Sequence, residues 1–161
     1  GEMNLSKWNK GKVMRMKKEQ VLSSLILVIL IGLFVACSEV TKPEAASRIQ
    51  INQILDDIED AVFTYDPEKI IDFIHQDFLH NGNDKIDQSY VWQIRLLHFN
   101  TMQIDNREIA ISQNSAFVSF DMTLIAPDST VVTEEPSEEY GDISYFIRDE
   151  GKWQLYGNQR Y

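Results

Sequence analysis

Few side chains in this sequence of 161 residues are of the types that do chemistry, and their spacing excludes several kinds of site. Cys37 is the sole cysteine, so the chain can form neither an internal disulfide nor a zinc site built on cysteines. The acidic run Asp56–Asp60 has the composition of a metal site, but consecutive carboxylates on a helix point in different directions. We therefore interpret the run as a solvent-exposed face, and we expect neither a metal nor a cofactor.

The motifs of several common enzyme classes are missing, and the charge excludes one class of partner. The chain contains no GxGxxG, GxxxxGK[ST], HExxH or GxSxG pattern. Residues 1–36 carry six Lys and Arg against two acids, a balance of +4, so the whole-chain charge of -10 leaves -14 on residues 37–161. Such an acidic domain repels phosphate backbones, so we expect no nucleic-acid partner.

An apolar segment, Val21–Cys37, follows a basic cluster at Arg15, Lys17 and Lys18. This layout is typical of an export signal, and its apolar core is shorter than the roughly 20 residues that cross a bilayer as a helix. The sequence FVAC at residues 34–37 resembles the lipobox of bacterial lipoproteins, in which the signal is cut before the cysteine and the sulfur receives a diacylglycerol. An uncleaved membrane anchor is the alternative interpretation.

These features divide the chain into four parts. Residues 1–13 are interpreted as an upstream remnant or non-native extension, and residues 14–36 as a lipoprotein signal peptide. Residues 37–46 comprise the lipidated cysteine and a polar linker, and residues 47–161 form one domain with a single core. Ser38 follows the cysteine, and by resemblance to lipoproteins of Gram-negative bacteria this implies the periplasmic face of the outer membrane.

Helical periodicity dominates the first half of the domain. The predicted helices cover residues 45–64, residues 66–78 and, after a turn at residues 80–84, residues 87–98. Asp66 and Pro67 suit the start of the second helix, as a capping residue and a first-turn proline. Asp87 or Ser89 can cap the third.

Alternating polarity replaces the helical period from Thr101 onward. The predicted strands cover residues 101–112, 116–124, 143–148 and 153–158. A slip of the pattern near Asn106 and Arg107 predicts a β-bulge. The acidic residues 126–141 are expected to form a long loop or a hairpin extension.

Three helices followed by a meander of antiparallel strands predict an α+β fold. Four segments resemble the NTF2-like superfamily, also called cystatin-like, which holds the ketosteroid isomerases and the SnoaL-type cyclases. They are residues 54–74, 77–82, 114–124 and 144–159. The resemblance implies a cone, with the N-terminal helices packed in a strongly curved antiparallel sheet.

The same resemblance implies a pocket inside the cone, where enzymes of the superfamily place Asp, His or Tyr. The ligand-pocket candidates are Tyr90, Trp92 and His98 from the helices and Tyr145 and Gln159 from the closing strands. His98 is of interest because an imidazole exchanges protons near neutral pH. Each also has a simpler interpretation, since a histidine at a helix end is often a cap and buried aromatic rings are often plain core. No catalytic set can be assigned.

Two functions remain open at this point. The one we favour is a non-catalytic module of the bacterial cell envelope, anchored to the lipid bilayer through acylated Cys37, that binds a small apolar ligand or another envelope protein. The other is a small isomerase, dehydratase or cyclase that acts on an apolar substrate in the cone pocket. The superfamily resemblance implies a homodimer through the outer sheet face. Phe117, Phe146 and Tyr156 on that face are either its contact or plain exposed strand aromatics.

Overall fold

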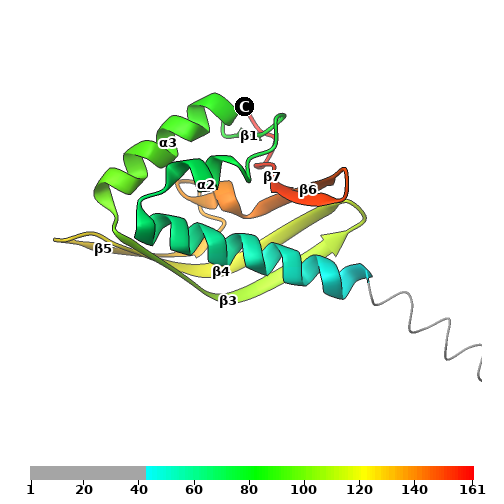
Figure 1. The fold of residues 1–161 in the computed structure, drawn as a ribbon, viewed down its shortest axis with the longest axis horizontal. Coiled ribbons are helices and arrows are strands. Elements are labelled where there is room, and N and C mark those ends of the chain that lie inside the picture. The colour runs from blue at the N-terminus through cyan, green and yellow to red at the C-terminus, as the bar shows by residue number, and fades with distance from the viewer. Residues whose placement is uncertain (1–42) are drawn as a thin grey trace, which may run out of the picture. The chain divides into compact units, whose positions relative to one another are not determined.

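The computed structural model describes residues 43–161, and Ala45–Tyr161 form one compact unit (Figure 1). The predicted signal peptide, Cys37 and the first part of the linker lie outside the described residues. Within the described part of the chain, helices come first and a meander of strands follows. No helix among these residues is both long and apolar enough to cross a membrane.

The first helix is described over residues 43–64, and it buries the face that its periodicity predicts. Ile51, Leu55, Ile58 and Val62 recur every three or four residues and are inaccessible to solvent. Residues 43–46, which their composition assigned to the linker, are already helical, because Glu and Ala are strong helix formers.

The second helix, α2 (Pro67–Ile71), begins at the predicted cap Asp66 but is much shorter than expected. The prediction of a helix to residue 78 is wrong because the backbone beyond α2 pairs with a distant strand. The His75 amide donates to the Leu155 carbonyl at 2.9 Å, and Ile74 forms a parallel bridge with Leu155. Long-range pairing therefore replaces local helical bonds.

A small hairpin and the third helix follow. They are β1 (Leu79–His80), β2 (Asn83–Asp84) and α3 (Lys85–His98). The N-cap of α3 is Asp84 and not the predicted Asp87 or Ser89. Its carboxylate accepts hydrogen bonds from two amides of the first turn, at 2.7 and 3.0 Å.

Five antiparallel strands form the main sheet. They are β3 (Thr101–Ser112), β4 (Ser115–Ile125), β5 (Thr130–Glu135), β6 (Tyr145–Asp149) and β7 (Lys152–Leu155). The order is β3-β4-β6-β7, and β5 also pairs with β4. One edge of β4 pairs with β3. Its other edge pairs with two strands, β5 beside residues 120–125 and β6 beside residues 115–117. The acidic segment after residue 126 thus contributes a fifth strand.

The bulge in β3 lies where the sequence predicts it. The register with β4 shifts between Asp105 and Glu108, and Asn106 has a φ of +52°. Arg107, also in the bulge, contacts Asp56 at 2.5 Å and Glu59 at 2.7 Å on the first helix. The acidic run is therefore not simply solvated, because two of its carboxylates hold the sheet against the helix.

Strand pairing corrects the predicted faces of the closing hairpin. Phe146 pairs with both Ala116 and Leu155, and all three are buried. The outer-face position expected for Phe146 is therefore wrong. Tyr145 pairs with Phe117 on the opposite face from this core, because neighbouring residues of a strand point to opposite sides.

Gly157 makes the closest backbone approach among the described glycines. Its φ is +72°, and a β-carbon added there would meet the Leu79 carbonyl oxygen at 2.3 Å. Gly151 offers a matched control, since its φ is +82° but no atom lies within 4 Å of an added β-carbon.

We expect Gly157→Ala to lower the free energy of unfolding by about 3 kcal/mol or more, because it combines backbone strain with a clash against main chain. Gly151→Ala is expected to lower it by about 1 kcal/mol, from strain alone. Urea denaturation of both variants measures the difference. Equal losses would contradict the close approach of Gly157 to β1.

Candidate functional site

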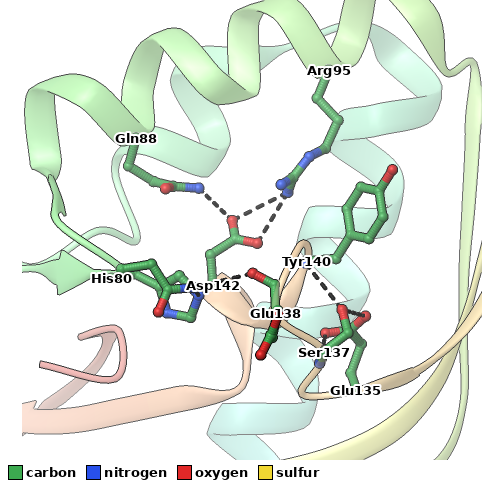
Figure 2. Close-up of polar contacts among 9 residues, drawn as sticks. His80, Gln88, Arg95, Glu135, Ser137, Glu138, Tyr140 and Asp142 are labelled. Carbon is green, nitrogen blue, oxygen red and sulfur yellow. Dashed lines mark hydrogen bonds and ion pairs between the residues drawn. The ribbon is translucent and has the colours of Figure 1, made fainter. Parts of the chain in front are cut away.

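The chain between β5 and β6 carries the most deeply buried polar groups of the sheet edge. After Glu135 it leaves β4, and it forms the buried 3-10 turn η1 (Gly141–Ile143) before β6 begins. This excursion points Asp142 toward α3, from which Gln88 and Arg95 point back (Figure 2).

Asp142 is the centre of a buried hydrogen-bonded cluster. Both of its carboxylate oxygens lie 3.1 Å from Nη1 of Arg95, and one also accepts a hydrogen bond from Nε2 of Gln88 (Figure 2). Asp142 is 3% exposed and Gln88 is 2% exposed. The guanidinium balances the carboxylate charge inside the protein, and both oxygens are occupied. Asp142 is therefore not free to act as a general base.

Two aromatic rings contact the guanidinium group of Arg95. Its guanidinium carbon lies 4.5 Å from the ring centroid of Trp92 and 5.0 Å from that of Tyr140. The Tyr140 amide donates to the Ser137 hydroxyl at 3.1 Å, which fixes the loop that carries the ring. The Trp92 indole N–H has no hydrogen-bond partner among the described residues.

Glu135 is a second buried carboxylate, 3% exposed, at the end of β5. It accepts hydrogen bonds from the amide and the hydroxyl of Ser137, both at 2.8 Å. Burial raises the pKa of Glu135, and the negative charge of Asp142 raises it further. The hydrogen bonds from Ser137 act in the opposite direction and lower the pKa. A carboxyl group with a raised pKa is a candidate proton donor.

His80 is buried, and its two ring nitrogens face different groups. Nδ1 accepts a hydrogen bond of 3.3 Å from the Asn158 amide, so Nε2 carries the proton in the neutral ring. The polar atom beside Nε2 is Nδ2 of Asn81, at 3.2 Å, which is itself a donor. The Nε2–H group therefore has no acceptor among residues 43–161.

The orientation of the Asn81 amide follows from its neighbours. Its Nδ2 donates to the Glu138 carbonyl at 3.1 Å, and its Oδ1 accepts from the Asn158 side chain at 2.7 Å. Asn158 is fixed in turn, because its Oδ1 accepts from the amides of Asn81 and Arg160. Rotating either side-chain amide would bring like groups together, so neither can offer His80 an acceptor.

Burial lowers the pKa of His80 below its ordinary value of 6.5, while the charge of Asp142 opposes this shift and that of Arg95 adds to it. The two donors beside the ring act in the same direction, since an imidazolium ion would need acceptors at both nitrogens. His80 is therefore neutral at neutral pH and donates from Nε2.

A cavity of about 410 Å³, here called the His80 pocket, opens beside this group. Its walls come from the β1–β2 turn, the chain after β5, the start of β6 and the C-terminal residues. They are His80, Asn81, Pro136, Ser137, Glu138, Tyr145, Asn158 and Arg160. Most of these side chains are polar, so the pocket suits a ligand that forms hydrogen bonds.

A second cavity of about 410 Å³ shares Tyr145 and Asn158 with the His80 pocket. Its walls are mostly apolar and include Ala110 and Phe117. The Phe117 and Tyr145 rings lie with their centroids 5.4 Å apart. Tyr145 thus separates a polar cavity from an apolar one.

The five predicted pocket residues do not converge on one site. Tyr145 lines both cavities, and Gln159 lines the second, although it lies beyond β7 and not on the helix side of a strand. Trp92 is fully buried beneath Arg95. Tyr90 is 60% exposed and His98 is also exposed, so neither faces the interior of the described domain.

Sequence reasoning missed His80 and the Asp142 cluster. Gln88, Trp92 and Arg95 recur at four and three residues, which is a helical period that could have placed the two polar residues on the buried face. His80 and Asp142 offered no comparable signal, because both lie in short irregular segments.

Comparisons with known proteins identify the fold. No family model matches the chain, and no curated protein matches it. Solved structures do, including a protein from Novosphingobium aromaticivorans assigned provisionally as a scytalone dehydratase, with a TM-score of 0.56 and 13% identity over 73% of this chain and 84% of that one.

Two further structures are of proteins of unknown function. A cystatin-like protein from Nostoc punctiforme has a TM-score of 0.55 and 14% identity, over 70% of this chain and 88% of its own. An NTF2-like protein from Shewanella oneidensis has a TM-score of 0.54 and 15% identity, over 69% of this chain and 95% of its own. The described domain therefore has the NTF2-like, or cystatin-like, α+β fold that its sequence predicts.

Proposed function

We propose that this chain is a lipid-anchored module of the bacterial cell envelope whose NTF2-like domain binds a small molecule in the His80 pocket without transforming it. The observation that carries the proposal is the buried His80 ring, which lines the pocket and has donors beside both nitrogens, so that its N–H has no acceptor among the described residues. A buried donor left unpaired costs about 1–3 kcal/mol. A ligand with a carbonyl or hydroxyl oxygen would recover that free energy.

The arrangement of the acidic groups favours binding over catalysis. The oxygens of Asp142 are occupied by Arg95 and Gln88, and those of Glu135 accept from Ser137. Neither of these two buried carboxylates lines the His80 pocket, and the carboxylate that does, Glu138, is on the exposed loop after β5. The expected apolar ligand would suit the neighbouring cavity better than this polar one.

An enzyme of the isomerase, dehydratase or cyclase type is the second candidate function. The raised pKa of buried Glu135 favours it, since a neutral carboxyl group can donate a proton to a substrate. The Ser137 hydroxyl, which binds Glu135 and also lines the His80 pocket, would connect the two. Turnover of a bound ligand that is lost in Glu135→Gln would establish this function and contradict the first.

We expect the His80→Phe variant to bind any small-molecule ligand about tenfold more weakly, since one hydrogen bond of roughly 1.4 kcal/mol is lost. A thermal-shift panel of sugars, polyols and hydroxy acids on the detergent-solubilised full chain would find the ligand, and calorimetry would compare affinities. His75→Gln is the matched control, because His75 is buried but does not line the pocket. Unchanged affinity in His80→Phe would refute this site.

The pH dependence of stability offers a second test of His80. Because its pKa is lower in the folded chain, the unfolded chain binds more protons below about pH 6.5, and stability should fall as pH falls through that range. His80→Gln should flatten this part of the profile. Nitrogen NMR should find the proton on Nε2, and a proton on Nδ1 would contradict the assigned network.

The Asp142–Arg95 pair should behave as a structural unit. Asp142→Leu or Arg95→Met each leaves a buried charge unpaired, and each is expected to lower the free energy of unfolding by about 3–5 kcal/mol. The double variant should lose clearly less than the sum, because it leaves no unpaired charge. Additive losses in a double-mutant cycle would show that the pair is not coupled.

The anchor is tested by mass spectrometry of protein recovered from bacterial membranes. We expect a chain that begins at Cys37 and carries acyl groups on it, and Cys37→Ser should carry no acyl groups and keep its leader. Recovery of an uncleaved leader with a free thiol would support the membrane-anchor alternative instead.

A further inference from the structure

The outer face of α3 carries a continuous apolar stripe that nothing in the described domain covers. Ile86, Tyr90, Ile94 and Leu97 are 66%, 60%, 57% and 83% exposed. Their spacings of four, four and three residues place them on one side of the helix. The buried residues Gln88, Trp92, Arg95 and Leu96 occupy the opposite side. We call these four exposed residues the α3 stripe.

We propose that two copies of this chain associate through the α3 stripe, with their α3 helices antiparallel. Figure 1 shows α3 along one edge of the domain, so a second helix can reach it. The proposal is independent of the ligand pocket, since no residue of the stripe lines the His80 pocket.

The order of residues along the stripe suits a two-fold axis. Ile86 and Leu97 are the outer members and Tyr90 and Ile94 the inner members, and both pairs are centred within one residue of Trp92. In an antiparallel pair, Ile86 of one copy therefore meets Leu97 of its partner, and Tyr90 meets Ile94. A two-fold contact of this kind is self-complementary, so one patch serves both copies.

Hydrogen-bonding groups along the edge of the stripe are complementary in the same arrangement, since a carboxylate accepts and an imidazole N–H donates. Asp87 and His98 are both exposed and stand eleven positions apart, which is close to three helical turns, so they flank the same side of the stripe. Their midpoint also falls next to Trp92. Each Asp87 carboxylate would thus face the His98 ring of the partner, and the opposed helix dipoles would add to the attraction.

The contact area sets the expected strength. A helix of 14 residues is about 21 Å long, and a stripe one helix wide gives less than the roughly 800 Å² per partner of a standard interface. We therefore expect a weak dimer that forms at micromolar concentration or above and dissociates on dilution.

Sedimentation of the full chain in detergent, below one chain per micelle, should show this concentration-dependent dimer. Tyr90→Asp, at the centre of the stripe, should weaken it at least tenfold, with circular dichroism unchanged. Val132→Lys is the matched control, since Val132 is 71% exposed but lies on β5. A monomer at every concentration, or a dimer that Tyr90→Asp leaves intact and Phe117→Asp disrupts, would overturn the proposal.

A charge exchange tests the antiparallel geometry. Asp87→Lys and His98→Glu should each weaken the dimer severalfold, and the double variant should restore it, because the introduced ammonium of one copy would then face the introduced carboxylate of the other. Failure of the double variant to recover would exclude this arrangement.

Flotation with neutral phosphatidylcholine vesicles completes the test, using residues 38–161, which contain the compact unit Ala45–Tyr161, so that neither the acyl anchor nor the apolar leader contributes. No binding to these vesicles is expected. Binding that Tyr90→Asp abolishes, in a chain that stays monomeric, would mean that the stripe faces lipid and would also overturn the dimer.

Discussion

The buried ion pair between Asp142 and Arg95 is the contact on which the site depends. It fixes the segment that leaves β5, so that β4 can pair with β5 at one end and with β6 at the other. Two ions removed from water are stable only when they are paired and hydrogen-bonded, and Gln88, Trp92 and Tyr140 complete that environment. The position of the loop is thus set by electrostatics, while the sheet around it is set by apolar packing.

The His80 pocket follows from the same loop. Gly141 lies so close to Pro136 and the His80 ring that an added β-carbon would stand 3.1 Å from one and 3.5 Å from the other. The backbone at Gly141 therefore packs against the His80 ring, which faces the pocket, and also positions Asp142, which faces α3. The two paired asparagines, Asn81 and Asn158, use their polar atoms on each other and on nearby backbone, so neither supplies an acceptor for the buried His80 ring.

The polarity pattern of a segment predicted the features that depend on that segment alone. The first helix, the β3 bulge and the strand β4 follow from alternation or periodicity within one segment, and all three are confirmed. The end of α2 and the faces of Tyr145 and Phe146 were predicted wrongly, because each depends on a partner far along the chain. The same limit hid the candidate site, since Asp142 meets Arg95 across 47 residues and His80 meets Asn158 across 78.

The bulge at Asn106 also constrains how this chain can change in length. Met102 and Ile104 precede it and Ile109 and Ile111 follow it, at positions of opposite parity, yet all four pair with inward-facing residues of β4. Deleting a single codon there would restore an even ladder with all four side chains still inward, but it would remove the twist of the bulge and displace Arg107 from its carboxylates, whereas a one-residue change elsewhere in β3 would turn one of these pairs outward. Length variation among relatives of this domain should therefore avoid β3.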